Sequence, residues 1–161
     1  IAGLLHDSAK YLNPETIKTY GVVCSPSELL VFATHKLIWH AVIAPKLILQ
    51  LFGHVDSDIL NAIKFHTTGN ENMDPLSEIL FVADYIEPGR SYDDIPYIKS
   101  LVETSLREAV FALSCSMLKS LNKRQLPIHY LSQNCHQWYK EILSERADKI
   151  ETLLDCPFKN I

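Results

Sequence analysis

Apolar residues along this chain recur at the spacing of an α-helix. Ile59, Ala62, Ile63 and His66 fall at positions i, i+3, i+4 and i+7, which places them on one face of a helix. The same spacing returns in a second stripe, made by Leu76, Ile79, Leu80 and Ala83. Two long amphipathic helices are predicted further on, over about residues 105–124 and 132–154. No segment shows convincing strand alternation, so the pattern predicts an all-α fold, a single-domain helical bundle over residues 1–161.

Capping residues and helix breakers mark the ends of the shorter helices. The first predicted helix begins almost at residue 1 and ends at Asn13–Pro14, where Asn13 caps a second helix that Gly21 closes. Ser25 and Glu28 form a capping box at the start of the third helix. The remaining predicted boundaries lie at Pro45, Gly53, Asp56, Gly69, Asp74–Pro75 and Pro88–Gly89.

The composition is that of an ordinary globular protein, with 47% hydrophobic and 21% charged residues among 161. A net charge of −4 argues against a general nucleic-acid binder, although it is compatible with a small anionic substrate. No apolar run approaches the ~18 residues of a membrane span, and no signal-peptide pattern is visible. Four scattered cysteines without a C-x-x-C pair indicate reduced thiols. We therefore expect a cytoplasmic protein with neither a nucleic-acid nor a membrane partner.

The segment Leu4–Lys10 carries the strongest chemical signal, because it contains His6 next to Asp7. Imidazole and carboxylate are both metal ligands, and neighbours on a helix point about 100° apart, so they can hold an ion from two directions. Lys10 follows on the same helical face. A metal site beside an ammonium group suggests an anionic substrate such as a phosphate. The alternative is a surface ion pair between Asp7 and Lys10 beside a buried histidine.

Three more residues of ligand type stand in apolar surroundings on other predicted helices. His40 is at the head of an apolar helix, His66 ends its stripe, and Asp84 follows an apolar run. A buried carboxylate is costly unless a metal ion or another charge compensates it. Separately, the histidines could be core residues and Asp84 could cap a helix or pair with Arg90. Their recurrence on several helices favours one shared metal centre.

The order His6–Asp7, His40, His66, Asp84 resembles the HD superfamily of metal-dependent phosphohydrolases. The resemblance is closer to its YqeK family, in three strings: Leu4-Leu5-His6-Asp7-x-x-Lys10, Ala62-Ile63-x-x-His66-Thr67-Thr68-Gly69, and Ala83-Asp84-Tyr85-Ile86-Glu87-Pro88-Gly89-Arg90. Ile128–His129 also falls where that family tends to place such a pair. The resemblance covers nearly the whole chain and implies an HD-type helical bundle.

This resemblance implies a symmetrical bis(5'-nucleosyl)-tetraphosphatase, which splits diadenosine tetraphosphate into two ADP. The implied cofactor is iron, as one ion or a pair, with manganese, cobalt or magnesium as alternatives. The implied metal ligands are His6, Asp7, His40, His66 and Asp84. The family has a further metal-binding histidine on a helix upstream of the HD pair, and no residue here matches it. Because the chain begins with Ile1, we expect it to be a fragment of a longer protein.

The predicted catalytic residues are Asp7, Lys10 and Arg90. Asp7 is the best candidate to bridge two ions, while Lys10, as a point charge, and Arg90, as a bidentate fork, would stabilise charge on phosphate. The predicted substrate contacts are Lys10, Thr67, Thr68, Gly69 and Arg90. Gly69 equally suits a plain helix C-cap. The other histidines are interpreted as structural or exposed: His35, His54, His129 and His136.

Three other functions stay open at this point. One is an HD phosphohydrolase acting on a different nucleotide or an alarmone. Another is a metal- or nucleotide-binding regulator that has lost catalysis, which the unmatched upstream histidine would favour. The last is a di-iron oxygenase on the same scaffold, against which Lys10 and Arg90 argue mildly. A homodimer is also compatible with the sequence.

Overall fold

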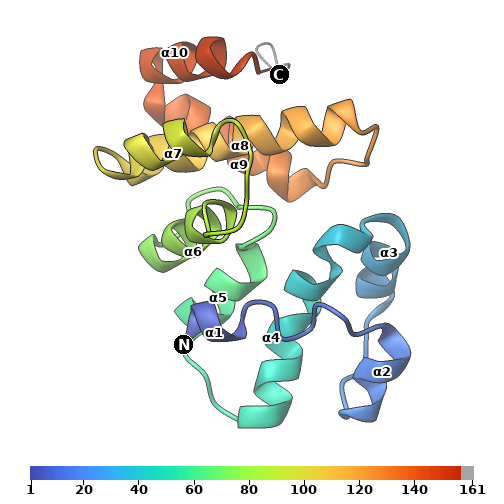
Figure 1. Cartoon of the computed structure of the whole chain (residues 1–161). Coiled ribbons are helices and arrows are strands. Elements are labelled where there is room, and N and C mark those ends of the chain that lie inside the picture. Colours follow the sequence, from blue (N-terminus) through green and yellow to red (C-terminus); the bar gives the residue numbers. More distant parts are fainter. Residues whose placement is uncertain (157–161) are drawn as a thin grey trace.

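The structure is a computed structural model that describes residues 1–156, and these residues fold into helices joined by turns and loops (Figure 1). In chain order the elements are α1 (Ala2–Leu5), α2 (Pro14–Thr19), α3 (Pro26–Thr34), the 3-10 helix η1 (Lys36–Ile38), α4 (Trp39–Phe52), α5 (Ser57–Phe65), α6 (Pro75–Tyr85), α7 (Ile95–Val102), α8 (Leu106–Lys123), α9 (Tyr130–Leu143) and α10 (Glu145–Leu154). No strand occurs among the described residues, where Pro88 and Arg90 form an isolated bridge. The predicted all-α fold is confirmed.

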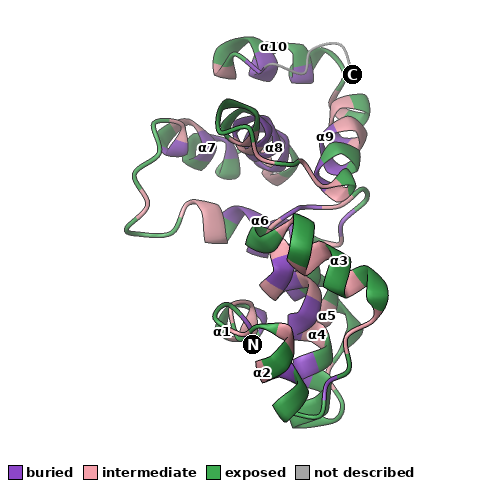
Figure 2. Cartoon of the chain, turned by 90° about the vertical axis from the view of Figure 1, so that its right-hand side faces the viewer, coloured by how far each residue is buried: buried purple, intermediate pink, exposed green. Residues whose placement is uncertain are grey.

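Two clusters of buried apolar side chains hold the helices together. The first lies among α1–α5 and includes Ile17, Trp39 and Ile63, while the second lies among α6–α10 and includes Phe111 and Tyr139. Figure 1 shows α1–α5 in the lower half of the molecule and α7–α10 in the upper half, with α6 between them. In Figure 2 the buried positions lie along the sides of helices that face other helices. No described helix is long and apolar enough to cross a membrane.

Helix α6 joins the two cores, because neighbouring residues on it face opposite halves of the molecule. Leu80 packs into the first cluster, whereas Phe81 and Val82 pack into the second. The predicted stripe on this helix is therefore wrong in part, since Ile79 is 52% exposed and Ala83 is also exposed. A helix packed on two sides buries a broader set of residues than a single amphipathic stripe.

The prediction of one helix from residue 1 to Asn13 is wrong, because α1 ends at Leu5. Tight turns follow, held by hydrogen bonds to carbonyls three residues back that the N–H groups of Ser8, Lys10 and Leu12 donate. Ala9 is fully buried in this segment, and Trp39 Nε1 donates to the carbonyl of Leu12 over 2.8 Å. Core packing thus overrides the helical pattern and presents the HD pair on a turn.

The predicted helix over residues 132–154 is two helices, α9 and α10. Ser144 lies between them with a φ of +48°, and this change of direction lets Ala147 and Ile150 reach the second core. Helix α7 was not predicted, although its buried residues Ile95, Ile98 and Leu101 are three apart. The long helix α8 is confirmed where it was expected.

Most of the predicted boundaries are confirmed in atomic detail. The Asn13 side chain accepts from the Thr16 N–H, and Ser25 and Glu28 form the capping box. Asp56 precedes α5, but its side chain makes no capping bond. Pro45 lies inside α4 instead of starting it. Because α4 begins at Trp39, His40 lies in the first turn of the helix.

Candidate metal centre and cleft

The five predicted metal ligands come from four separate parts of the fold and meet at one place. His6 and Asp7 lie in the turn after α1, His40 lies in the first turn of α4, His66 follows the last residue of α5, and Asp84 lies in the last turn of α6. One ligand atom each from His6, Asp7 and His66 lies within 4.8 Å of the others. The fold thus builds a compact group of imidazole and carboxylate donors, with His40 and Asp84 beside it.

Asp7 is central to this group, since each of its oxygens faces a different set of neighbours. Its Oδ1 lies 3.3 Å from His40 Nε2 and 3.9 Å from His66 Nε2. Its Oδ2 lies 3.6 Å from His6 Nε2 and accepts a hydrogen bond from Lys10. Asp84 Oδ1 lies 3.6 Å from the same His6 Nε2. A carboxylate whose two oxygens face different ligand atoms has the arrangement of a bridging ligand.

Backbone carbonyls fix the orientation of two of the imidazole rings. His6 Nδ1 lies 2.8 Å from the Gly3 carbonyl, and His66 Nδ1 lies 2.7 Å from the Ile63 carbonyl. A carbonyl can only accept, so each Nδ1 donates and each Nε2 presents a lone pair to the centre. His40 Nε2 lies 3.1 Å from His66 Nε2. The inward lone pairs of His6 and His66, together with the carboxylate oxygens, are a donor set that fits a bound cation.

The electrostatics of the centre favour the forms that bind metal. Burial, reinforced by the neighbouring His66, lowers the pKa of His40 from 6.5 to about 4. Burial also lowers the pKa of His66. For Asp7, burial acts to raise the pKa, but the Lys10 hydrogen bond and the nearby imidazoles together lower it. Neutral imidazoles and an ionised carboxylate are therefore present at neutral pH.

Both predicted phosphate-binding cations make ion pairs at the centre. Lys10 pairs with Asp7, while Arg90 donates through Nη2 to Asp84 Oδ1 over 2.8 Å and through Nε to Glu87 Oε1 over 2.9 Å. The structure thus contains the ion pairs that sequence reasoning had offered as alternatives. Arg90 also lines the cleft described below, so its pairing with carboxylates does not remove it from contact with a ligand.

The Thr67–Gly69 segment divides into residues with different surroundings. The Thr67 hydroxyl is buried without a hydrogen-bond partner and its residue lines the cleft. The Thr68 hydroxyl donates to the Gly69 carbonyl over 2.8 Å. Gly69 has a φ of +64°, and a Cβ on it would lie 2.4 Å from Cys135 Sγ. Close packing and backbone conformation thus account for glycine here, and Thr67 is the residue of this segment with an unused polar atom.

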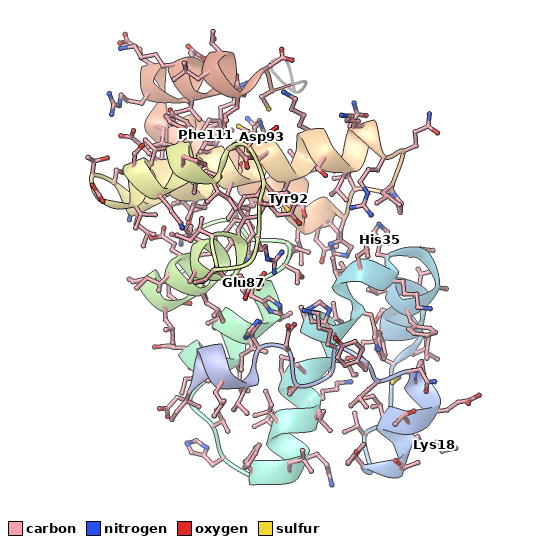
Figure 3. The ribbon with its side chains drawn as sticks, in the orientation of Figure 1. Lys18, His35, Glu87, Tyr92, Asp93 and Phe111 are labelled. Atoms are coloured by element: carbon pink, nitrogen blue, oxygen red, sulfur yellow. The ribbon has the colours of Figure 1, made fainter. Side chains whose placement is uncertain are left out.

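A cleft of about 840 Å³ extends from the metal centre toward the C-terminal helices. His66, Asp84 and Arg90 line its inner end, and Tyr92 lines it on the segment that rises from α6 to α7 (Figure 3). The ring of Tyr92 stacks on that of Tyr85 with 5.1 Å between centroids. The volume of the cleft is in the range that holds a nucleotide-sized ligand.

Sequence reasoning missed the basic residues at the far side of this cleft. Lys119, Lys123 and Arg124, from the last turns of α8 and the residue after it, line the same cavity as Arg90. The available signal was the spacing of these cations, at i, i+4 and i+5 near the end of a long helix. That pattern is common on solvated helices, so only the fold shows that they face the cleft.

An all-helical fold that gathers an HD pair, two further histidines and a second aspartate at one point defines a metal centre of the histidine–aspartate type. The family model for the HD domain matches residues 1–89. The chain belongs to the HD domain family, whose members are metal-dependent phosphohydrolases.

Curated relatives extend this comparison over most of the chain. The symmetrical bis(5'-nucleosyl)-tetraphosphatase of Bacillus subtilis is 33% identical over 80% of this chain and 68% of that protein. The protein of the same name from Halalkalibacterium halodurans is 31% identical over 80% of this chain and 68% of its own. A crystal structure described as a predicted HD superfamily hydrolase involved in NAD metabolism, from Clostridium acetobutylicum, has a TM-score of 0.74 and 28% identity, and the match covers 88% of this chain and 75% of that chain.

The lowered pKa of His40 predicts an acid-sensitive fold in the absence of metal. Between about 6.5 and about 4 the unfolded chain binds a proton at this position and the folded chain does not, so the free energy of unfolding decreases as pH falls through this range. Urea unfolding of metal-free protein at several pH values measures the slope. We expect a shallower slope for His40→Asn, and a wild-type slope for His54→Asn, whose side chain is 94% exposed. Parallel slopes for wild type and His40→Asn would contradict this assignment.

Proposed function

We propose that this protein hydrolyses diadenosine tetraphosphate symmetrically to two ADP, with iron held by His6, Asp7, His40, His66 and Asp84. The observation that carries the proposal is the convergence of these five groups at the inner end of a cleft that is lined by cations. Similarity to the two tetraphosphatase relatives supports the choice of substrate. Manganese, cobalt and magnesium are alternative ions.

The arrangement around Asp7 supports a pair of ions instead of one. His40 and His66 lie near Oδ1, and His6 lies near Oδ2 with Asp84 beyond it. When bound, such ions lower the pKa of water toward about 7 and polarise phosphoryl oxygens. Lys10 holds Asp7 ionised and in position through its hydrogen bond. The carbonyls of Gly3 and Ile63 hold the His6 and His66 rings in the orientation that keeps each Nε2 directed inward.

Phosphoryl transfer depends mainly on positioning the substrate and on stabilising the charge of the transition state. Cationic side chains of the site would stabilise that charge. Arg90 is anchored by Asp84 and Glu87 and lies where the metal centre meets the cleft. Its planar guanidinium can contact two phosphate oxygens at once. The unpartnered Thr67 hydroxyl can donate a further hydrogen bond to phosphate. These two residues would hold the central phosphates of the substrate beside the ligands.

A symmetrical cut requires that one nucleoside diphosphate unit extends away from the attacked phosphorus. The cleft provides this room, and Lys119, Lys123 and Arg124 on its far side match the charge of a phosphate chain. The stacked rings of Tyr85 and Tyr92 line the same space and offer an apolar surface to a base.

A cytoplasmic location is consistent with four described cysteines that form no disulfide.

Product analysis tests the symmetrical cut directly. We expect diadenosine tetraphosphate incubated with iron-loaded protein in ¹⁸O-water to give ADP as the sole nucleotide product, with the label on the terminal phosphate of half of it. Asp7→Asn, which keeps the size of the side chain but removes the charge at the centre, should give no ADP. Release of AMP with ATP would contradict the proposed position of attack.

Replacing Arg90 by lysine separates its bidentate contact from its charge. We expect kcat/KM to fall on the order of tenfold, because a charge-assisted hydrogen bond contributes roughly 1.5–3 kcal/mol. The melting temperature should change little, since a partly exposed ion pair contributes about 0–1 kcal/mol. Arg107→Lys is the matched control, because Arg107 is 62% exposed and pairs with Glu78 away from the centre. Equal kcat/KM values for the two variants would show that Arg90 is only a structural partner of Asp84.

A further inference from the structure

A second group of metal-ligand side chains lies in the C-terminal core, apart from the HD centre. Cys115 on α8, His136 on α9 and Cys156, two residues after α10, each offer one ligand atom within 4.8 Å of the others. All three are buried, with exposed fractions of 0%, 2% and 2%. Cys115 Sγ lies 3.9 Å from His136 Nδ1.

A buried carboxylate lies beside this group, next to His136. Glu151, on the last turns of α10, is 2% exposed, and its Oε1 lies 3.4 Å from His136 Nε2. Neither of these two buried atoms has a hydrogen-bond partner. Buried polar atoms without partners are rare in native proteins and often mark a missing ion or water. Here the two atoms lie 3.4 Å apart, and Lys140 Nζ lies 3.1 Å from the same Glu151 oxygen.

The hydrogen bonds around His136 explain why these two atoms are unsatisfied. The Ser114 hydroxyl donates to the Phe111 carbonyl over 2.7 Å, so its oxygen is left to accept from His136 Nδ1, which lies 3.1 Å away. With its hydrogen on Nδ1, a neutral imidazole presents a bare Nε2 to the carboxylate of Glu151. The ring is neutral at pH 7, because burial lowers the pKa of His136 to about 4. Nε2 and Glu151 Oε1 therefore face each other as two acceptors, and because Lys140 pairs with the carboxylate, Nε2 is the atom left without a donor.

We propose that Cys115, His136 and Cys156, with Glu151 as the fourth ligand, bind one thiophilic divalent metal ion, of which Zn²⁺ is the best fit. Two thiolates, one imidazole and one carboxylate form a ligand set of zinc-binding type. Four ligands from the protein leave no open position, so the ion would be structural. It would connect α8, α9 and α10. Lys119 on α8 and Leu154 on α10 belong to the wall of the cleft.

Charge balance allows this ion to enter a buried site. A hydrogen bond with Cys156 and burial raise the pKa of Cys115, so the metal-free site holds thiols. Binding a divalent ion releases both thiol protons, and this exchange leaves the net charge of the cluster unchanged. Lys140 Nζ lies 3.1 Å from Glu151 Oε1 and balances the carboxylate. The site therefore avoids the large cost of an uncompensated buried charge.

Cobalt spectroscopy tests this site independently of the HD centre, whose ligands contain no sulfur. The full chain, reduced and freed of metal, is titrated with Co²⁺, and the thiolate-to-cobalt charge-transfer band is recorded in the near ultraviolet. We expect the band to saturate at one ion per chain and to disappear when Zn²⁺ displaces cobalt. Because this readout needs only the wild-type protein, absence of the band would overturn the proposal whatever the variants do.

Variants then assign the band to particular residues. Cys115→Ser and Cys156→Ser should each lose at least half of the band intensity per chain, while Asp7→Ala should keep it. Cys135→Ser is the matched control, since Cys135 is equally buried but outside the cluster, and it should keep the band. Circular dichroism verifies that each variant is folded. A band that survives in the Cys115→Ser/Cys156→Ser double variant would overturn the proposal, as would reduced protein that binds no cobalt but forms a Cys115–Cys156 disulfide on oxidation.

Discussion

The carboxylate of Asp7 is the interaction on which the arrangement of the site depends. It lies on a turn within reach of three imidazoles, and Lys10 holds it ionised. A negative charge in this position would be costly in an apolar interior without positive partners. Burial lowers the pKa of His40 and of His66, so these two imidazoles are neutral in the absence of metal. Lys10 compensates the charge of Asp7 directly. A bound cation would satisfy the remaining lone pairs of the imidazoles and carboxylates.

The two cores of the molecule explain why this centre opens onto a cleft. Most of the ligands come from the first core, whereas Asp84 arrives on α6, the helix shared with the second core. The cleft is lined by the residues after α5, by α6 and by helices of the second core, and it includes both Arg90 and the cations of α8. The C-terminal helices therefore supply a binding wall in addition to covering apolar surface. An ion held by Cys115, His136 and Cys156 would stabilise that wall.

The side chains that converge at the HD centre could be singled out from sequence because they are polar residues in apolar segments. His66 completes a helical stripe, and Asp84 follows an apolar run, so both were directed inward by the same pattern that predicts their helices. The geometry of the HD pair was not predictable in this way. Residues 6–11 follow a helical pattern in sequence, but burial of Ala9 and the Trp39 hydrogen bond hold them in turns.

The features that sequence reasoning missed depend on contacts between distant segments. The break at Ser144 appears only because α10 must reach the second core. Cys115 lies on α8 and Cys156 follows α10, without a recognisable spacing motif, and His136 had been interpreted as structural. The cations of α8 could equally have faced solvent. Local patterns therefore predicted the fold class and the first group of converging side chains, while the cleft and the cluster around His136 required the packing of α6–α10.

Metal content is the most direct test of the claim that Asp7 organises a metal centre. Wild-type protein and the variant Asp7→Ala are produced with iron in the medium, purified without chelator, and analysed for metal content by elemental mass spectrometry. The control variant is Asp93→Ala, which changes an exposed acidic residue of the outer cleft. The account predicts iron in the wild type and in Asp93→Ala, and its loss from folded Asp7→Ala. Equal iron content in wild type and Asp7→Ala would contradict it.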